Sequence, residues 1–183
     1  TPVLDGIGHG FFKHPRIYLV HLYTLYIVNI FYNIDSMKSI FESSSYKEVL
    51  ERIERLDDRN VALWGKMNVD QMLWHCQGPL NIILEKEDYG LKSNWLVKTF
   101  FKKSLYNDKP WRKSLPTTQV FKALESKDLN AEKTKLISLI HELYQQRDRE
   151  QWNPHPVFGK FTKEQWGQMQ YKHLDHHLKQ FGA

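Results

Sequence analysis

The chain has 183 residues, of which 41% are hydrophobic and 26% charged, a composition typical of one globular domain with a buried core. The single cysteine, Cys76, excludes an internal disulfide, and we expect a reducing, cytoplasmic setting. The formal charge is +5, but acidic and basic residues are interleaved. This pattern favours a solvated basic surface over a specific nucleic-acid interface.

Residues 1–36 precede the first methionine, Met37, and we treat them as an N-terminal extension. Within them, residues 17–32 form an aromatic-rich run that is shorter than the about 20 apolar residues of a membrane span. Three interpretations compete: a stretch read through upstream of a natural start at Met37, an apolar anchor or interfacial helix, and a helix that packs on the domain. We favour the first, and we expect membrane binding only if residues 17–32 are a real anchor.

Two helices are predicted in the first half of the remaining domain, residues 37–183. The first spans residues 46–56, where apolar side chains recur every three or four positions, at Val49, Leu50, Ile53 and Leu56. The second begins after Asn68, which forms a capping-box pattern with Gln71, and reaches to about Glu87.

The second half of the domain is also predicted to be helical. Residues 94–105 form a short amphipathic helix, and residues 106–129 form a long irregular connection. Asn130 is expected to cap a third long helix. Thr162 is expected to cap the last one, and Gln165 completes a second capping-box pattern with it. Because no strand signal of any length appears, we expect an all-α fold, a four-helix bundle with one or two short extra helices.

The last predicted helix contains two histidines, His173 and His177, four residues apart. Four residues is just over one helical turn, so both imidazoles project from one face and can bind the same ion. They belong to a core-facing stripe that comprises Trp166, Met169, Gln170, His173, His177 and Gln180. A buried polar side chain destabilises the fold unless it is hydrogen-bonded or bound to a metal, and a coordinated metal would engage both histidines. The alternative is that one histidine is only hydrogen-bonded and the other is half-exposed.

A third ligand has to come from another helix. His75 is the better candidate, because it lies mid-helix among apolar residues and beside Pro79. His141, on the third long helix, is the competitor and is expected on a flank. Three histidines would leave an open coordination position, which is typical of catalytic rather than structural metal sites. The pattern does not specify the metal, since zinc, nickel and iron all accept imidazole.

Further candidates for chemistry are weaker. His155, in a loop between two prolines, and Asp70 are the nominations for a general base or proton shuttle. His176 should point about 100° away from its neighbour and lie at a rim. Cys76 is expected to be a buried, inert thiol.

Several motifs of residues 37–183 resemble the DinB-like (YfiT-type) superfamily of four-helix-bundle metal proteins, and in particular one of its bacterial branches. The motifs are the Trp-Gly-Lys-Met of residues 64–67, Gln-Met-Leu-x-His-Cys of 71–76, Lys-Ser-Leu-Pro of 113–116, His-Pro-Val-Phe-Gly of 155–159 and Tyr-Lys-His-Leu-Asp-His-His-Leu-x-Gln-Phe-Gly of 171–182.

The resemblance implies a set of functional residues. The ligands of that superfamily are one histidine on the second helix and a His-x-x-x-His pair on the fourth, often followed by a glutamine. These positions are His75, His173 and His177 here, with Gln180 orienting a ligand.

The resemblance also implies an activity. Relatives include thiol-S-transferases that use low-molecular-weight thiols such as bacillithiol, and mycothiol-dependent isomerases. We therefore expect a divalent-metal-dependent enzyme, a transferase or hydrolase, in which an activated thiol or water attacks a small electrophilic substrate. The partner would be that small molecule, and both a monomer and a homodimer are compatible with the sequence. The alternative is a non-catalytic, stress-related binding or scaffold module.

Overall fold

The computed structural model describes residues 37–183, which form one compact unit. The interpretations of residues 1–36 as a read-through stretch, an anchor or a packing helix lie outside the described residues. In the described part, no helix is both long enough and apolar enough to cross a membrane.

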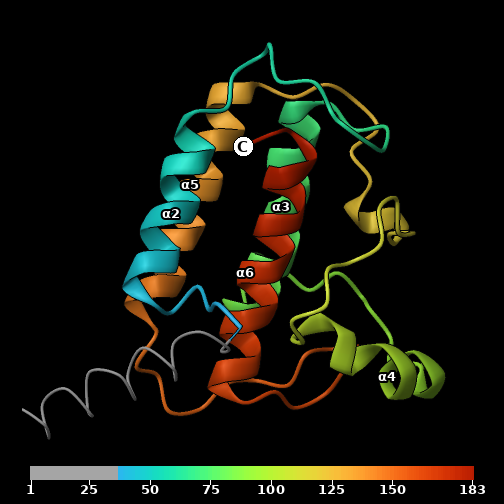
Figure 1. Cartoon of the computed structure of the whole chain (residues 1–183). Coiled ribbons are helices and arrows are strands. Elements are labelled where there is room, and N and C mark those ends of the chain that lie inside the picture. The colour runs from blue at the N-terminus through green and yellow to red at the C-terminus, as the bar shows by residue number, and fades with distance from the viewer. Residues whose placement is uncertain (1–36) are drawn as a thin grey trace, which may run out of the picture. The chain divides into compact units, whose positions relative to one another are not determined.

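Four long helices form the body of the domain (Figure 1). They are α2 (Ser43–Glu54), α3 (Val69–Ile83), α5 (Leu129–Gln145) and α6 (Lys163–Gln180). Helix α2 packs against α5 and α6, and α3 packs against the same two helices, so the four enclose a common core. The described residues contain no strand, and the prediction of an all-α fold is confirmed.

Three short helical segments lie in the connections: α4 (Trp95–Phe101), the 3-10 turn η1 (Lys102–Leu105) that directly continues it, and the 3-10 turn η2 (Gln119–Phe121). The long segment between α3 and α5 therefore passes beside the bundle with little regular structure, as expected. Its course matters for function, because it brings side chains and carbonyl groups to α3 and α6.

Each long helix contributes fully buried apolar side chains to the core. Ile53 of α2, Leu73 of α3, Ile140 of α5 and Leu174 of α6 are all inaccessible to solvent or nearly so. Burying a side chain of this size stabilises a fold by roughly 1.5–3 kcal/mol. The core therefore holds α3 rigidly against α6, which is the helix pair that carries the candidate metal ligands.

Local capping fixes where two of these helices begin. The side chain of Asn68 accepts a hydrogen bond from the backbone N–H of Gln71 at 3.1 Å, and the side chain of Gln71 accepts one from the N–H of Asn68. Thr162 and Gln165 form the same reciprocal pair at the start of α6. Both capping boxes were predicted, and both are confirmed.

Other boundaries differ from the prediction. Helix α5 begins at Leu129, because the side chain of Asp128, not Asn130, accepts the N–H of Ala131 at 2.9 Å. The earlier start also lets Leu129 pack against the core. Helix α3 ends at Ile83 rather than near Glu87, since Glu85 adopts a left-handed φ of 60° that an α-helix cannot contain.

Candidate metal centre

Three histidines converge between α3 and α6. His75 lies on α3, and His173 and His177 lie one turn apart on α6; all three are buried. One ring nitrogen of each lies within 4.8 Å of those of the other two. Nε2 of His75 lies 3.3 Å from Nε2 of His173. This group could therefore hold a metal ion, and it contains the three residues that the sequence nominated.

The tautomers of His75 and His177 follow from their hydrogen bonds. Nδ1 of His75 lies 2.9 Å from the backbone carbonyl of Phe121, and Nδ1 of His177 lies 2.8 Å from the side-chain oxygen of Gln180. A carbonyl oxygen can only accept, so each Nδ1 carries the hydrogen and donates it. Each Nε2 is then left with a lone pair, which is the form that binds a metal.

Gln180 is itself held in one orientation. Its amide nitrogen donates to the backbone carbonyl of Trp64 at 2.6 Å, which directs its oxygen to His177. The backbone N–H of Leu63 donates in return to the carbonyl of Gln180 at 2.7 Å. Gly65 allows the loop of Trp64 to pass close to Gln180, since a Cβ at this position would lie 2.6 Å from the amide nitrogen of Gln180. Its φ of +84° is also one that glycine adopts readily.

The third histidine lacks such a partner. Nδ1 of His173 is buried and bonds to no group in the described part of the chain. Either its Nε2 carries the hydrogen and donates to His75, or its Nε2 lone pair faces the lone pair of His75 at 3.3 Å. A cation between the rings would be bound by all three lone pairs at once. The donor set thus fits a divalent ion that prefers imidazole, such as zinc, nickel or iron.

Burial keeps the three rings neutral. It lowers the pKa of His75, and it lowers the pKa of His177 to about 3. Burial, together with the neighbouring imidazoles, lowers the pKa of His173 well below its ordinary value. Because a protonated imidazole cannot bind a metal, these environments favour the binding-competent form at neutral pH.

His176 and two tryptophans lie beside the three histidines. The ring of His176 is half-buried, with its centroid 5.1 Å from that of His177. It lies between Trp64 and Trp111, with centroid distances of 5.6 Å to each. Trp111 also contacts His173, at 5.9 Å. His176 thus lies beside the ligands in an aromatic surround, at the partly exposed position that the sequence indicated for it.

Lys172 holds the segment that carries Trp111. Its buried ammonium donates to the carbonyls of Ser104 and Asn107 at 2.7 and 2.8 Å, and to the side-chain oxygen of Asn107. The indole N–H of Trp111 donates to the same Ser104 carbonyl. Burial lowers the pKa of Lys172 to about 8. This lysine, next to a candidate ligand on α6, ties the long connection to the site.

Sequence reasoning gave no role to Phe121, Trp111 or Lys172, although Lys172 lies within the motif of residues 171–182. No local pattern marks Phe121, because its backbone carbonyl would be the same with any residue at that position. The Trp-Gly-Lys-Met motif did point to the loop of Trp64, although not to its hydrogen bond with Gln180.

The two weak candidates for a general base lie elsewhere. Asp70, in the first turn of α3, accepts hydrogen bonds from the Ser126 hydroxyl at 3.0 Å and from the backbone N–H of Lys127. His155 is buried against Phe158, Phe161 and Trp166, at the start of α6. Trp166 precedes His173 by seven residues, or about 10 Å along the helix. The described contacts bring neither residue to the three histidines.

The remaining candidates also occupy ordinary structural positions. His141 is exposed on α5, where its Nδ1 is hydrogen-bonded to the hydroxyl of Tyr46, so it lies on a flank as expected. Cys76 is buried next to Met72, and burial raises the pKa of its thiol. Neither residue belongs to the group of His75, His173 and His177, which we call the metal-ligand group.

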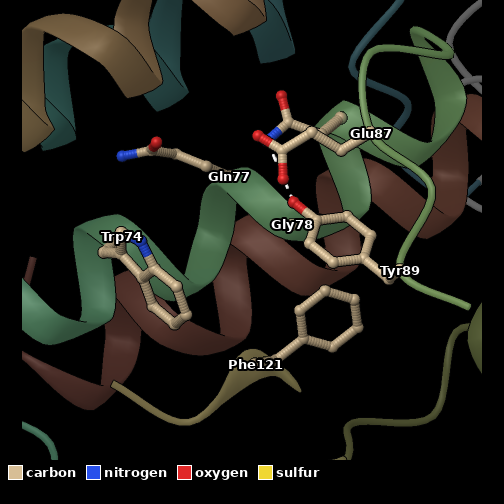
Figure 2. A pocket seen from close by; sticks show the side chains of 7 residues that line it. Trp74, Gln77, Gly78, Glu87, Tyr89 and Phe121 are labelled. Carbon is tan, nitrogen blue, oxygen red and sulfur yellow. Dashed lines mark hydrogen bonds between the residues drawn. The ribbon is translucent and has the colours of Figure 1, made fainter. Parts of the chain in front are cut away.

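A pocket borders the site on the next face of α3 (Figure 2). Its lining comprises Trp74, Gln77, Gly78, Asn81, Glu87, Tyr89 and Phe121. The ring of Phe121 faces this pocket, while its carbonyl holds His75. Gly78 permits the close packing, since a Cβ there would lie 2.5 Å from the Phe121 ring. Phe121 therefore connects the pocket to the metal-ligand group.

Comparison with known protein families gives a match. The family described as "Protein of unknown function (DUF1569)" matches residues 36–183, which include the whole of the described domain. No curated protein and no solved structure matches the chain.

Proposed function

This chain belongs to the DUF1569 family, and we propose that it is a metal-dependent enzyme with His75, His173 and His177 as ligands of one divalent ion. We also propose, on the motifs of residues 64–67, 71–76 and 171–182, that it is a DinB-like protein. The observation that carries the proposal is the convergence of three buried imidazoles, two of which have their outer nitrogens held by carbonyl oxygens.

The bound ion would supply a Lewis acid that lowers the pKa of a thiol or a water molecule and so yields a nucleophile at neutral pH. The protein's own residues would prepare for this step. Phe121 and Gln180 keep Nε2 of His75 and of His177 free of hydrogen and correctly aimed. Three protein ligands would leave a coordination position open to the small molecule.

The surroundings of the site support a small substrate. Trp64, His176 and Trp111 flank the ligands with aromatic rings, and Lys172 ties the segment of Trp111 to α6. Aromatic rings at this position would lower the polarity around the ligands and so strengthen electrostatic interactions there. We propose a small electrophile as substrate, with a low-molecular-weight thiol or water as the second reactant. A reducing cytoplasm would keep such a thiol in its active form.

The test is to measure bound metal per chain by mass spectrometry on untagged protein. About one metal ion per chain is expected in the wild type, and none in His173→Ala. The matched control is His141→Ala, which removes an exposed histidine outside the group and should keep the metal. Circular dichroism would verify that each variant is folded.

Two results would overturn the metal site. One is metal retained at full stoichiometry by His173→Ala, and the other is no metal in any protein after loading with zinc, nickel or iron. If the ion is bound, screens for thiol transfer and for hydrolysis would follow, with His173→Ala as the negative control. A protein that binds metal but fails every such screen would instead be a non-catalytic metal-binding module.

A further inference from the structure

Helix α4 exposes a cluster of large apolar side chains. None of its seven residues is buried, and Trp95, Leu96, Phe100 and Phe101 are between 55% and 70% exposed. Single exposed apolar residues are ordinary on protein surfaces, but four large ones within a helix of seven residues are an unusual concentration, which we call the apolar patch. A patch of this kind marks a surface that is covered when the protein functions.

The segment that carries this patch has charged side chains of one sign only. Residues 89–107 contain four lysines, at positions 92, 98, 102 and 103, and no aspartate or glutamate. Within residues 37–183, none of these four ammonium groups forms an ion pair, whereas Lys38, Lys86 and Lys135 each pair with a glutamate. The partner that covers the patch should therefore be apolar and negatively charged.

The patch is attached firmly to the domain. Lys102 donates to the backbone carbonyl of Lys160 and lies 4.6 Å from the centre of the Phe161 ring. Ser93, before the helix, donates to the carbonyl of Val157 at 2.9 Å. These contacts use the ammonium group of Lys102, whereas those of Lys92, Lys98 and Lys103 form no hydrogen bond to the described residues. Helix α4 lies at the edge of the bundle (Figure 1).

We propose that α4 and η1 form a docking surface for an anionic lipid bilayer. Exposed Trp and Phe side chains can enter the boundary between headgroups and acyl chains, while lysines contact the anionic headgroups. The proposed surface consists of residues 95–105, which do not include the aromatic-rich run of residues 17–32. The proposal concerns where the protein is located and does not depend on the function proposed above.

Co-sedimentation of the full chain with vesicles tests this surface. The vesicles would be phosphatidylcholine alone, or phosphatidylcholine with roughly one third phosphatidylserine. We expect binding to the mixed vesicles only, weaker at high salt. Phe100→Asp should weaken it at least about tenfold, and so should Lys98→Glu combined with Lys103→Glu. Leu124→Asp, at an even more exposed apolar residue outside the patch, should bind like the wild type.

Three results would overturn the proposal. The first is no binding of the wild type to mixed vesicles. The second is undiminished binding of Phe100→Asp, which would assign membrane contact to another part of the chain, such as residues 17–32. The third is a dimer, found without vesicles by sedimentation velocity, that Phe100→Asp dissociates. Since Phe100 is exposed, an unchanged melting temperature should show that its substitution leaves the fold intact.

Discussion

The side-chain oxygen of Gln180 accepts a hydrogen bond from Nδ1 of His177 at 2.8 Å. The two residues lie three positions apart on α6, so one helix supplies both a candidate ligand and the group that sets its tautomer. For His75, the tautomer is set by a hydrogen bond from its Nδ1 to the backbone carbonyl of Phe121, 46 residues away in the chain. The tautomers of these two candidate ligands therefore depend on one local and one long-range hydrogen bond.

Removing the local hydrogen bond should weaken metal binding. In Gln180→Ala, the tautomer and the ring of His177 are no longer fixed, and we expect zinc affinity to fall about 10–100-fold. Competition with a chromogenic chelator would measure it. Gln145→Ala, at an exposed glutamine near the end of α5, is the matched control and should bind zinc normally. An affinity for zinc that is equal in the two variants would show that Gln180 does not support the site.

Metal should stabilise the fold through these histidines. A ligand that binds only the native state raises the free energy of unfolding by about 2.7 kcal/mol at a concentration of 100 times its Kd. For a domain of this size the melting temperature should rise by about 5–10 °C. Thermal melts with zinc and with EDTA would measure the rise. His177→Ala should lose it and His141→Ala should keep it, and the opposite pattern would contradict the assignment.

Gly65 should be needed for both stability and metal affinity. Gly65 and Gly90 both have left-handed φ values, of 84° and 62°, so alanine at either position strains the backbone by about 1–2 kcal/mol. Only at Gly65 would the new Cβ also meet the amide nitrogen of Gln180.

We therefore expect Gly65→Ala to lower the denaturation midpoint more than Gly90→Ala and, unlike it, to weaken zinc binding. Urea unfolding and chelator competition would measure the two effects. Equal losses of stability and of zinc affinity in both variants would mean that the close approach of Gly65 to Gln180 is unimportant.

His155 should make the metal-free protein less stable in mild acid. Burial and the charge of Lys102 lower its pKa from an ordinary value of 6.5 to about 4. The unfolded chain therefore takes up a proton below pH 6.5 while the folded chain does not until about pH 4. The stability that His155 contributes is complete above pH 6.5 and is lost as the pH falls from 6.5 to 4, by at most about 3 kcal/mol.

His155→Asn isolates this effect. The side-chain oxygen of asparagine can replace Nδ1 of His155, which accepts the backbone N–H groups of Val157 and Phe158, but asparagine does not titrate. Urea unfolding between pH 4 and 7 in EDTA should give a shallower pH dependence in the variant. The other buried histidines affect the free energy of unfolding equally in both proteins. If this free energy changed with pH by the same amount in the two proteins, the low pKa of His155 would be contradicted.

Local interactions explain which features were predictable from the sequence. The capping boxes at Asn68 and Thr162 join residues three positions apart, and His173 and His177 share a face wherever their helix packs. The beginning of α5 was missed because Asp128 and Asn130 are both good caps. Burial of Leu129 against the core, which depends on tertiary packing, favours the earlier one.

Only the tertiary structure decided which distant groups meet the histidine pair. His75 and His141 both lie on long helices, but α3 presents His75 to α6, whereas α5 leaves His141 exposed beside Tyr46. The carbonyl of Phe121 and the ring of Trp111 reach the site from an irregular connection whose course no periodicity encodes. The sequence by itself determined one helix face with two candidate ligands, because helical geometry is local. The third ligand and the surround depend on how the helices pack, which is a property of the whole chain.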